Sequence, residues 1–139
     1  MYKRQVQALL FGDGGITAIG ANCFNMAFVE VFIGYYLYKI ISGASSITSG
    51  RRVMAAGIAG YVAINVAALS AAIMFGIQPL LHRAASGESL YCPYGLGVAI
   101  PAMLSEHLLF FGWVEAIVTA LVVKYLQKQD PALLKAGER

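Results

Sequence analysis

Residues 101–123 read PAMLSEHLLFFGWVEAIVTALVV, a stretch long and apolar enough to cross a bilayer although it contains Glu106, His107 and Glu115. Each ionisable group near the centre of such a helix costs about 2.5–3.5 kcal/mol on insertion scales. The Leu, Ile, Phe and Val residues of the stretch return only ~5 kcal/mol in all, which two carboxylates would cancel. These groups therefore need polar partners inside a bundle, or water, and a cation pathway is the leading reason to retain them.

Two further stretches have the length of a bilayer crossing. Residues 53–75 contain no charged residue, and residues 22–41 are interrupted only by Glu30 and, at their end, by Lys39. Hydrophobic residues make up 59% of the chain and charged residues 12%, about half the charged share of a soluble domain. A soluble helical bundle would need a polar face that residues 53–75 lack. We expect an all-α membrane protein in which residues 1–139 form one transmembrane domain with about three spans.

The basic residues predict the orientation of these spans. Three of them flank the short loop after the first span, and four follow the last span (Lys39, Arg51 and Arg52; Lys124, Lys128, Lys135 and Arg139). Under the positive-inside bias both groups face the cytoplasm, so the loop at residues 76–97 faces outward. We expect a multi-pass protein of the cell (inner) membrane with a cytoplasmic carboxy terminus. The net charge of +3 is therefore no indication of nucleic-acid binding.

Two segments outside the spans have simple interpretations. Val6–Phe11 is apolar but far shorter than the roughly 20 residues that a crossing needs, so it is typical of a truncated helix. Residues 43–50 (GASSITSG) are polar and small, which predicts a flexible connector. Within the central span, Ala56 and Gly60 are four residues apart, as are Ala68 and Ala72. This spacing predicts a smooth helix face for close contact with a neighbouring helix.

Polar side chains of the spans fall at similar depths. Counted from the ends of the spans, Glu30, Asn65 and Glu115 all lie near the bilayer midplane, which suggests one shared interior layer. On a regular helix His107 and Glu115 are separated by about 80° around the axis and can border one cavity. A buried hydrogen-bond network that fixes helix register is an alternative explanation for the same residues. The sequence leaves both possibilities open.

Several strings in order resemble one family. They are QALLFGDGGIT at 7–17, GAN at 20–22, NMA at 25–27, LYCPY at 90–94, IPAM at 100–103 and EAIVT at 115–119. Together they resemble the cobalt/nickel substrate-binding (S) component of energy-coupling-factor (ECF) transporters, namely the cobalamin-biosynthesis M protein and its nickel relative. The resemblance implies a helical bundle of the S-component type and covers nearly the whole chain.

The resemblance also implies a function and partners. The expected function is capture of Co(II) or Ni(II) as transported substrate, with no permanently bound cofactor and no enzymatic reaction in this chain. The expected partners are a transmembrane coupling protein, cytoplasmic ATPase subunits, a small membrane accessory subunit and membrane lipid. The imported metal would serve cobalamin biosynthesis. ATP is hydrolysed on the partners, in agreement with the lack of a phosphate-binding motif here.

The resemblance assigns roles to two residues, and three further polar residues of the spans are candidates from the residues themselves. His107 and Glu115 match recurring positions of the family's last helix, and His107 is the expected metal ligand. Glu115, Glu30, Asn65 and Asn22 are expected to line the cavity or to orient the residues around the ion. The family's main ligands belong to a Met-His start and a further early His. This chain starts Met1-Tyr2-Lys3-Arg4, so we expect it to correspond to the later two thirds of a complete member.

Two other hypotheses fit the sequence. The small-residue face of the second span fits a non-transporting membrane subunit, or a degenerate fragment, that only docks helices. The midplane carboxylates fit a part of a proton-coupled channel or transporter. Sequence patterns do not choose between cobalt and nickel, because both ions accept the same nitrogen donors.

Overall fold

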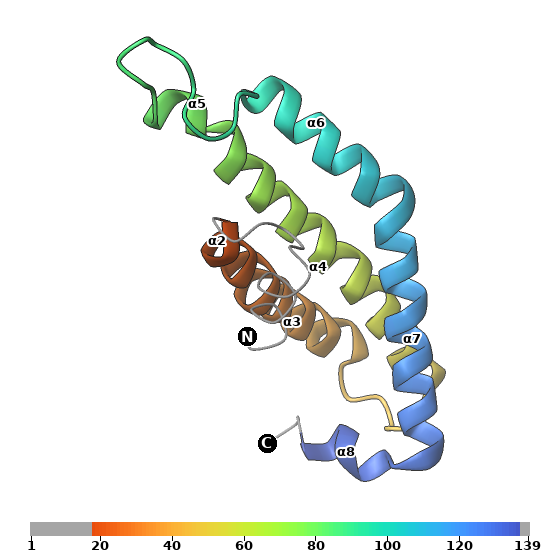
Figure 1. Cartoon of the computed structure of the whole chain (residues 1–139). Coiled ribbons are helices and arrows are strands. Elements are labelled where there is room, and N and C mark those ends of the chain that lie inside the picture. Colours follow the sequence, from red (N-terminus) through yellow and green to blue (C-terminus); the bar gives the residue numbers. More distant parts are fainter. Residues whose placement is uncertain (1–17, 137–139) are drawn as a thin grey trace.

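The computed structural model describes residues 18–136, and their regular structure is helical apart from one isolated bridge between Arg83 and Ser89 (Figure 1). Three of its helices are long and apolar enough to cross a membrane: Ile19–Ser42, Gly50–Leu81 and Leu96–Gln129. Each contains one of the stretches expected from the sequence. The prediction of an all-α membrane protein with about three spans is therefore confirmed. The short apolar segment Val6–Phe11 lies outside the described residues.

The first long helix consists of three consecutive pieces. They are α2 (Ile19–Phe24), a π-helical turn η2 (Asn25–Val29) and α3 (Glu30–Ser42). The helix ends at Gly43, whose φ of +52° lies in the left-handed region that favours glycine. The Gly43 amide donates to the carbonyl of Lys39 at 3.1 Å and closes the last turn.

The second long helix is α4 (Gly50–Gly76), followed by the short α5 (Gln78–Leu81). Ser49 caps its start, because the Ser49 hydroxyl accepts a hydrogen bond from the Arg51 amide at 3.2 Å. At the other end, a Cβ on Gly76 would lie 2.8 Å from the Cα of Leu96, the first residue of the third long helix. Only glycine fits this contact without movement of the backbone.

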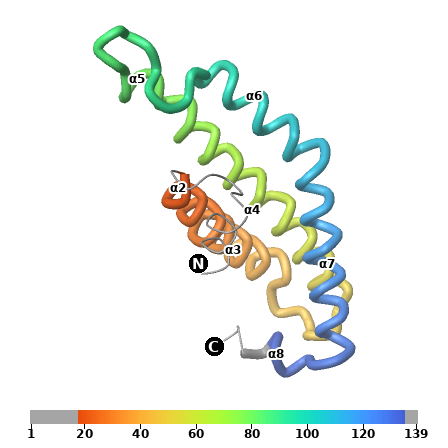
Figure 2. Tube along the Cα trace, viewed as in Figure 1, coloured from red at the N-terminus to blue at the C-terminus, as the bar shows by residue number. Residues whose placement is uncertain are grey.

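The third long helix runs through α6 (Leu96–Glu106), a second π-helical turn η3 (His107–Phe111) and α7 (Gly112–Gln129). Pro101 lies inside α6, and the Cα trace changes direction between α6 and α7 (Figure 2). Bends of this kind arise at prolines and at π-helical turns. A short α8 (Pro131–Ala136) follows, and the Asp130 carboxylate accepts a hydrogen bond from the Ala132 amide at 3.2 Å.

The second long helix lies at the centre of the arrangement. Helix α4 contacts both α3 and α7, while α3 and α7 make almost no contact with each other. In Figure 1, α3 and α7 lie on opposite sides of α4, and α8 turns back toward the end of α3. In the most apolar window of the central span 33% of the residues are buried, against 6% in each of the other two spans. The core is therefore built around α4 and its small side chains.

The loop between α3 and α4 is held by three side chains, in contrast to the flexible connector expected from its composition. Arg51 Nε donates to the Ile41 carbonyl at 2.7 Å, and Arg52 donates twice to the Ser45 carbonyl. Gln127 Nε2, on α7, donates to the carbonyls of Ile47 at 2.7 Å and Ser49 at 3.0 Å. Composition shows that the segment is polar, but the donors that hold it come from α4, which follows it, and from α7, which is distant in the sequence.

Candidate functional site

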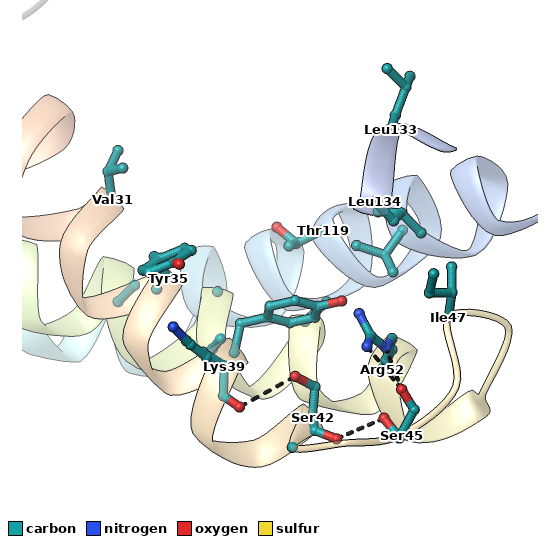
Figure 3. A pocket seen from close by; sticks show the side chains of 18 of the residues that line it. Val31, Tyr35, Lys39, Ser42, Ser45, Ile47, Arg52, Thr119, Leu133 and Leu134 are labelled. Atoms are coloured by element: carbon teal, nitrogen blue, oxygen red, sulfur yellow. Dashed lines mark hydrogen bonds between the residues drawn. The ribbon is translucent and has the colours of Figure 1, made fainter. Parts of the chain in front are cut away.

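A cavity of about 830 Å³ opens between α3, α4 and α7. Its floor is formed by small residues of α4. One of its ends is formed by the α3–α4 loop and by α8. Figure 3 shows Tyr35 and Lys39 on one side, Thr119 on the other, and Leu133 and Leu134 of α8 at one end. The floor consists of Ala56, Ala59, Gly60 and Ala63.

Glu30 and Glu115 both line this cavity, although they belong to different spans. Each follows a π-helical turn: Glu30 comes directly after η2, and Glu115 lies in the first turn of α7 after η3. A π-helical turn inserts an extra residue and rotates all later side chains around the helix axis. Such turns often occur at functional sites. Two of the residues that the sequence places near the midplane therefore line the same cavity.

The Glu115 carboxylate is oriented within its own helix. Thr119 Oγ1 donates to Glu115 Oε1 at 2.9 Å, and the two residues are one turn apart on α7. Gly60 of α4 faces them, and a Cβ at this position would lie 3.1 Å from Thr119 Oγ1 and 3.6 Å from Glu115 Cγ. The missing side chain at Gly60 provides the space in which this pair lies. The close contact with a neighbouring helix that the spacing of Ala56 and Gly60 predicts is thus confirmed at Gly60, and the neighbour is α7.

The end of the cavity near the α3–α4 loop carries positive charge. Arg52 and Lys39 line it, and Arg52 is only 4% exposed. Arg52 Nε and Nη2 donate to the Ser45 carbonyl at 3.1 and 2.8 Å, so its guanidinium orders the loop as well (Figure 3). Lys39 Nζ lies 5.8 Å from the centre of the Tyr35 ring, a cation–π distance. Carboxylates and cations therefore occupy separate parts of one cavity.

Asn65 lies outside the cavity, at the contact between α4 and α7. Its side chain is buried, and Nδ2 donates to the Tyr61 carbonyl at 2.7 Å. A Cβ on Gly112 would lie 2.8 Å from Asn65 Nδ2. Asn65 Oδ1 finds no hydrogen-bond partner in the part of the chain that the structure describes. Asn65 is not among the residues that line the cavity with Glu30 and Glu115, and its expected role around the ion stays a prediction.

His107 also lies outside the residues that line the cavity. It starts η3, its Nδ1 is 2.8 Å from the Met103 carbonyl, and its ring centre is 5.6 Å from that of Phe111. The expected separation of about 80° from Glu115 assumes a regular α-helix, whereas the π-helical turn lies between the two residues. His107 and Glu115 therefore do not line the same cavity in this structure. The role of His107 as a metal ligand stays a prediction.

Asn22 lies in α2, is half-buried and is not a lining residue of the cavity. Asn25, three residues further along the chain, is a buried polar residue that sequence reasoning missed. Asn25 is 2% exposed, and its Nδ2 donates to the sulfur of Met74 at 3.4 Å. Its Oδ1 has no partner among residues 18–136. An amide inside an apolar span was the available signal, because buried polar groups are normally hydrogen-bonded.

The described range holds no group of three or more His, Cys, Asp and Glu side chains that could bind a metal ion together. His107 nevertheless has the nitrogen chemistry for a single metal bond. A carbonyl oxygen only accepts hydrogen bonds, so in the neutral ring Nδ1 is the protonated nitrogen. Nε2 then keeps the lone pair that a metal ion requires.

Comparisons with known proteins identify the family. Residues 5–133 match the family model described as "Cobalt uptake substrate-specific transmembrane region". The chain is 50% identical over 129 residues to a fused nickel transport protein, NikMN, of Rhodobacter capsulatus, covering 93% of this chain and 37% of that protein. It is 46% identical over 134 residues to a putative metal transport protein of Methanocaldococcus jannaschii, covering 96% of this chain and 55% of that protein.

A solved structure supports the same assignment. A crystal structure of a transition metal transporter matches with a TM-score of 0.81 and 53% sequence identity, covering 94% of this chain and 56% of that one. The chain thus spans from 37% to 56% of the length of these three proteins. The match of the family model over residues 5–133 shows that the chain belongs to the cobalt uptake substrate-specific transmembrane region family.

Proposed function

We propose that this chain is a membrane-embedded part of an uptake system for Co(II) or Ni(II), in which its helices surround part of the route of the ion. The observation that carries the proposal is that Glu30 and Glu115, from two spans, line one cavity of a fold shared with a transition metal transporter. Carboxylates inside membrane spans are costly and mark ion routes. The names of the relatives point to the same ions.

The two carboxylates provide negative charge for a divalent cation, and His107 provides a nitrogen of the kind that Co(II) and Ni(II) favour. In this proposal Glu30 and Glu115 attract the ion in the cavity, and His107 contacts it at another point of the route. Asn65 and Asn22 orient the helices around that route. The hydrogen bond from Thr119 keeps Glu115 Oε1 directed to one side, so the other carboxylate oxygen faces the cation.

The proposal includes partners and an orientation. In agreement with the ECF resemblance, a transmembrane coupling protein and cytoplasmic ATPase subunits supply the energy, and a small accessory subunit completes the membrane part. The metal feeds cobalamin biosynthesis. The chain lies in the cell (inner) membrane with its carboxy terminus in the cytoplasm, because Arg51, Arg52, Lys124 and Lys128 are then all on the cytoplasmic side.

Metal uptake by cells tests the function. The chain is co-expressed with the amino-terminal part of a complete relative and its ATPase partners, and accumulation of radioactive cobalt or nickel is measured against an ATPase-dead control. We expect Glu115→Gln to lower accumulation about tenfold, the scale of losses at groups that tune metal sites. Glu106→Gln is the matched control, because Glu106 is exposed and lies outside the cavity lining.

Accumulation that stays at the level of the ATPase-dead control rejects the transport proposal. Equal effects of the Glu115→Gln and Glu106→Gln variants reject the role of the cavity. If both variants transport normally while a bulky residue at Gly60 prevents assembly, the chain acts as a helix-docking subunit instead.

A further inference from the structure

A second cavity, of about 490 Å³, lies between the start of α4 and the end of α7. It shares no lining residue with the cavity that contains the carboxylates, and it is lined by Thr48, Gly50, Val53, Lys124, Gln127 and Lys128. Gln127 joins the two sides, because its Nε2 donates to the carbonyls of Ile47 at 2.7 Å and Ser49 at 3.0 Å. In Figure 1 the α3–α4 loop accordingly passes beside the last turns of α7. The walls of this cavity are therefore held in place by hydrogen bonds.

Two lysines give this cavity a positive charge that the chain itself does not balance. Lys124 and Lys128 are one turn apart on α7, a spacing at which like charges repel each other. Neither lysine makes a hydrogen bond or an ion pair with the residues that the structure describes. The nearest carboxylate along the chain, Asp130, accepts a hydrogen bond from the Ala132 amide. An anion beside both ammonium groups relieves the repulsion, and phosphate is an anion that lysine commonly binds.

An exposed apolar surface leads along α7 to these lysines. Ile117 and Leu121 are each 58% exposed. Ile117, Leu121, Lys124 and Lys128 follow one another at intervals of four, three and four residues, so they lie along one face of the helix. The third long helix has 34 residues, whereas about 20 suffice to cross the hydrocarbon core. Its last turns therefore reach the lipid headgroups, and this face changes from apolar to cationic at that level.

We propose that this second cavity binds the headgroup phosphate of an anionic phospholipid. Lys124 and Lys128 hold the phosphate, the Thr48 hydroxyl is a further donor at the cavity, and one acyl chain lies along Ile117 and Leu121. The apolar face favours a phospholipid over a free phosphate ion, because only the lipid has an acyl chain to place there. The bound lipid also links the start of α4 to the end of α7. The inference concerns membrane lipid and does not depend on the transported ion.

The test uses the full chain in detergent with two probes, phosphatidylglycerol and phosphatidylcholine with the same acyl chains. The two lipids are added in equal amounts, and the ratio bound to the protein is measured by native mass spectrometry. Lys128→Gln removes one charge of the cavity, and Lys124→Gln with Lys128→Gln removes both. Arg83→Gln is the matched control for a single charge, because Arg83 follows α5 at the other end of α4 and outside this cavity. Lys124→Arg with Lys128→Arg keeps both charges.

We expect the unmodified chain to prefer phosphatidylglycerol. The preference should fall about fivefold in Lys128→Gln and about twentyfold in the double glutamine variant, since each basic residue near an anionic headgroup contributes about 1 kcal/mol. Arg83→Gln and the double arginine variant should keep the preference. Equal elution profiles and helical circular dichroism of all variants exclude misfolding as the cause. Phosphatidylglycerol with a photoreactive group in its acyl chain should attach to residues 117–124.

Four results overturn the proposal. The first is equal binding of the two lipids by the unmodified chain. The second is an equal loss in Lys128→Gln and Arg83→Gln, which would show an effect of net charge and no local site. The third is displacement of the lipid by glycerol phosphate at the same concentration, which would show a site for free phosphate esters. The fourth is photoattachment outside residues 117–128 only. No metal ion is added in this test, so its outcome is independent of the proposed uptake function.

Discussion

The two sides of α4 differ in how closely their neighbours approach. Toward α7, a Cβ on Gly57 would lie 3.2 Å from the Ala116 carbonyl oxygen, and a Cβ on Gly112 would lie 2.8 Å from Asn65 and Tyr61 atoms. Toward α3, a Cβ on Gly34 would meet Ala63 at 3.5 Å, an ordinary contact. Glycines at the α4–α7 contact thus allow the two helices to approach closely. On the α3 side there is space for a methyl group at Gly34, and this side borders the cavity. One face of α4 is therefore closely packed against α7, and the other leaves space in which a ligand could bind.

The largest expected effect comes from the tightest point of the α4–α7 contact. Gly112→Ala places a methyl group within 2.8 Å of Asn65 and Tyr61 and should destabilise the protein by about 1–3 kcal/mol. Gly97→Ala is the control, because nothing lies within 4 Å of a Cβ there, and alanine should slightly stabilise α6. Thermal unfolding in detergent can be followed by the fluorescence of Trp113, whose ring centre is 5.1 Å from that of Tyr61. Equal unfolding temperatures of the two variants would contradict the close contact.

A second pair of glycines compares the two sides directly. Gly57→Ala meets backbone atoms of Ala116, which cannot move independently of α7, and should cost about 1 kcal/mol. Gly34→Ala meets only the Ala63 methyl group and should be neutral or stabilising through helix propensity. Unfolding of both variants under the same detergent conditions gives the comparison. If Gly34→Ala is the more damaging change, the two sides of α4 have been assigned the wrong way round.

A smaller effect is expected from the hydrogen bond between Thr119 and Glu115. Thr119→Val keeps the shape of the side chain but removes the donor to Glu115 Oε1. Hydrogen bonds between membrane side chains average about 0.6 kcal/mol, so the loss of stability should be of that size. Thr119→Ser retains the hydroxyl and serves as the control in unfolding measurements. A serine variant that loses as much stability as the valine variant would show that the methyl group matters and the hydrogen bond does not.

The smallest expected effect is local to the loop between α3 and α4. Gln127→Leu removes the two hydrogen bonds to the Ile47 and Ser49 carbonyls. Amide hydrogen exchange at residues 45–49 should become faster by about tenfold at most, while exchange in α4 stays unchanged. Gln129→Leu is the control, because Gln129 is exposed at the end of α7. Rapid exchange throughout this loop in the unmodified protein would restore the flexible connector predicted from composition.

The candidate site residues were predictable to different degrees. Glu30 and Glu115 stand out in the sequence, because a carboxylate in an apolar span requires an explanation. Their meeting at one cavity also agrees with their similar depth. Asn65 was placed in the same layer on equal grounds, but it faces Gly112 instead. Depth along a helix can be counted from a sequence, whereas the direction of a side chain depends on the neighbours that the helix acquires.

The π-helical turns explain the second difference. The relation between His107 and Glu115 was derived for a regular helix, and η3 lies between them. The residues HLLFF at 107–111 contain no sequence feature that predicts a π-helical turn. In the structure the Tyr61 hydroxyl donates to the Leu108 carbonyl within this turn at 3.1 Å. A hydrogen bond from another helix to a backbone carbonyl is a tertiary interaction, so a single helical segment cannot reveal it.

The order of residues along the chain is sufficient to recognise a helical membrane protein with three long apolar segments, and its ordered motifs identify the family. Both conclusions follow from local chemistry: apolar residues enter the bilayer, and their helices satisfy backbone hydrogen bonds internally. The packing of the helices was needed to learn which polar residues line the cavity, which glycines permit close contact, and that the cavity lies over α4 between α3 and α7. These features depend on the rotation of each helix, which is selected by packing against its neighbours.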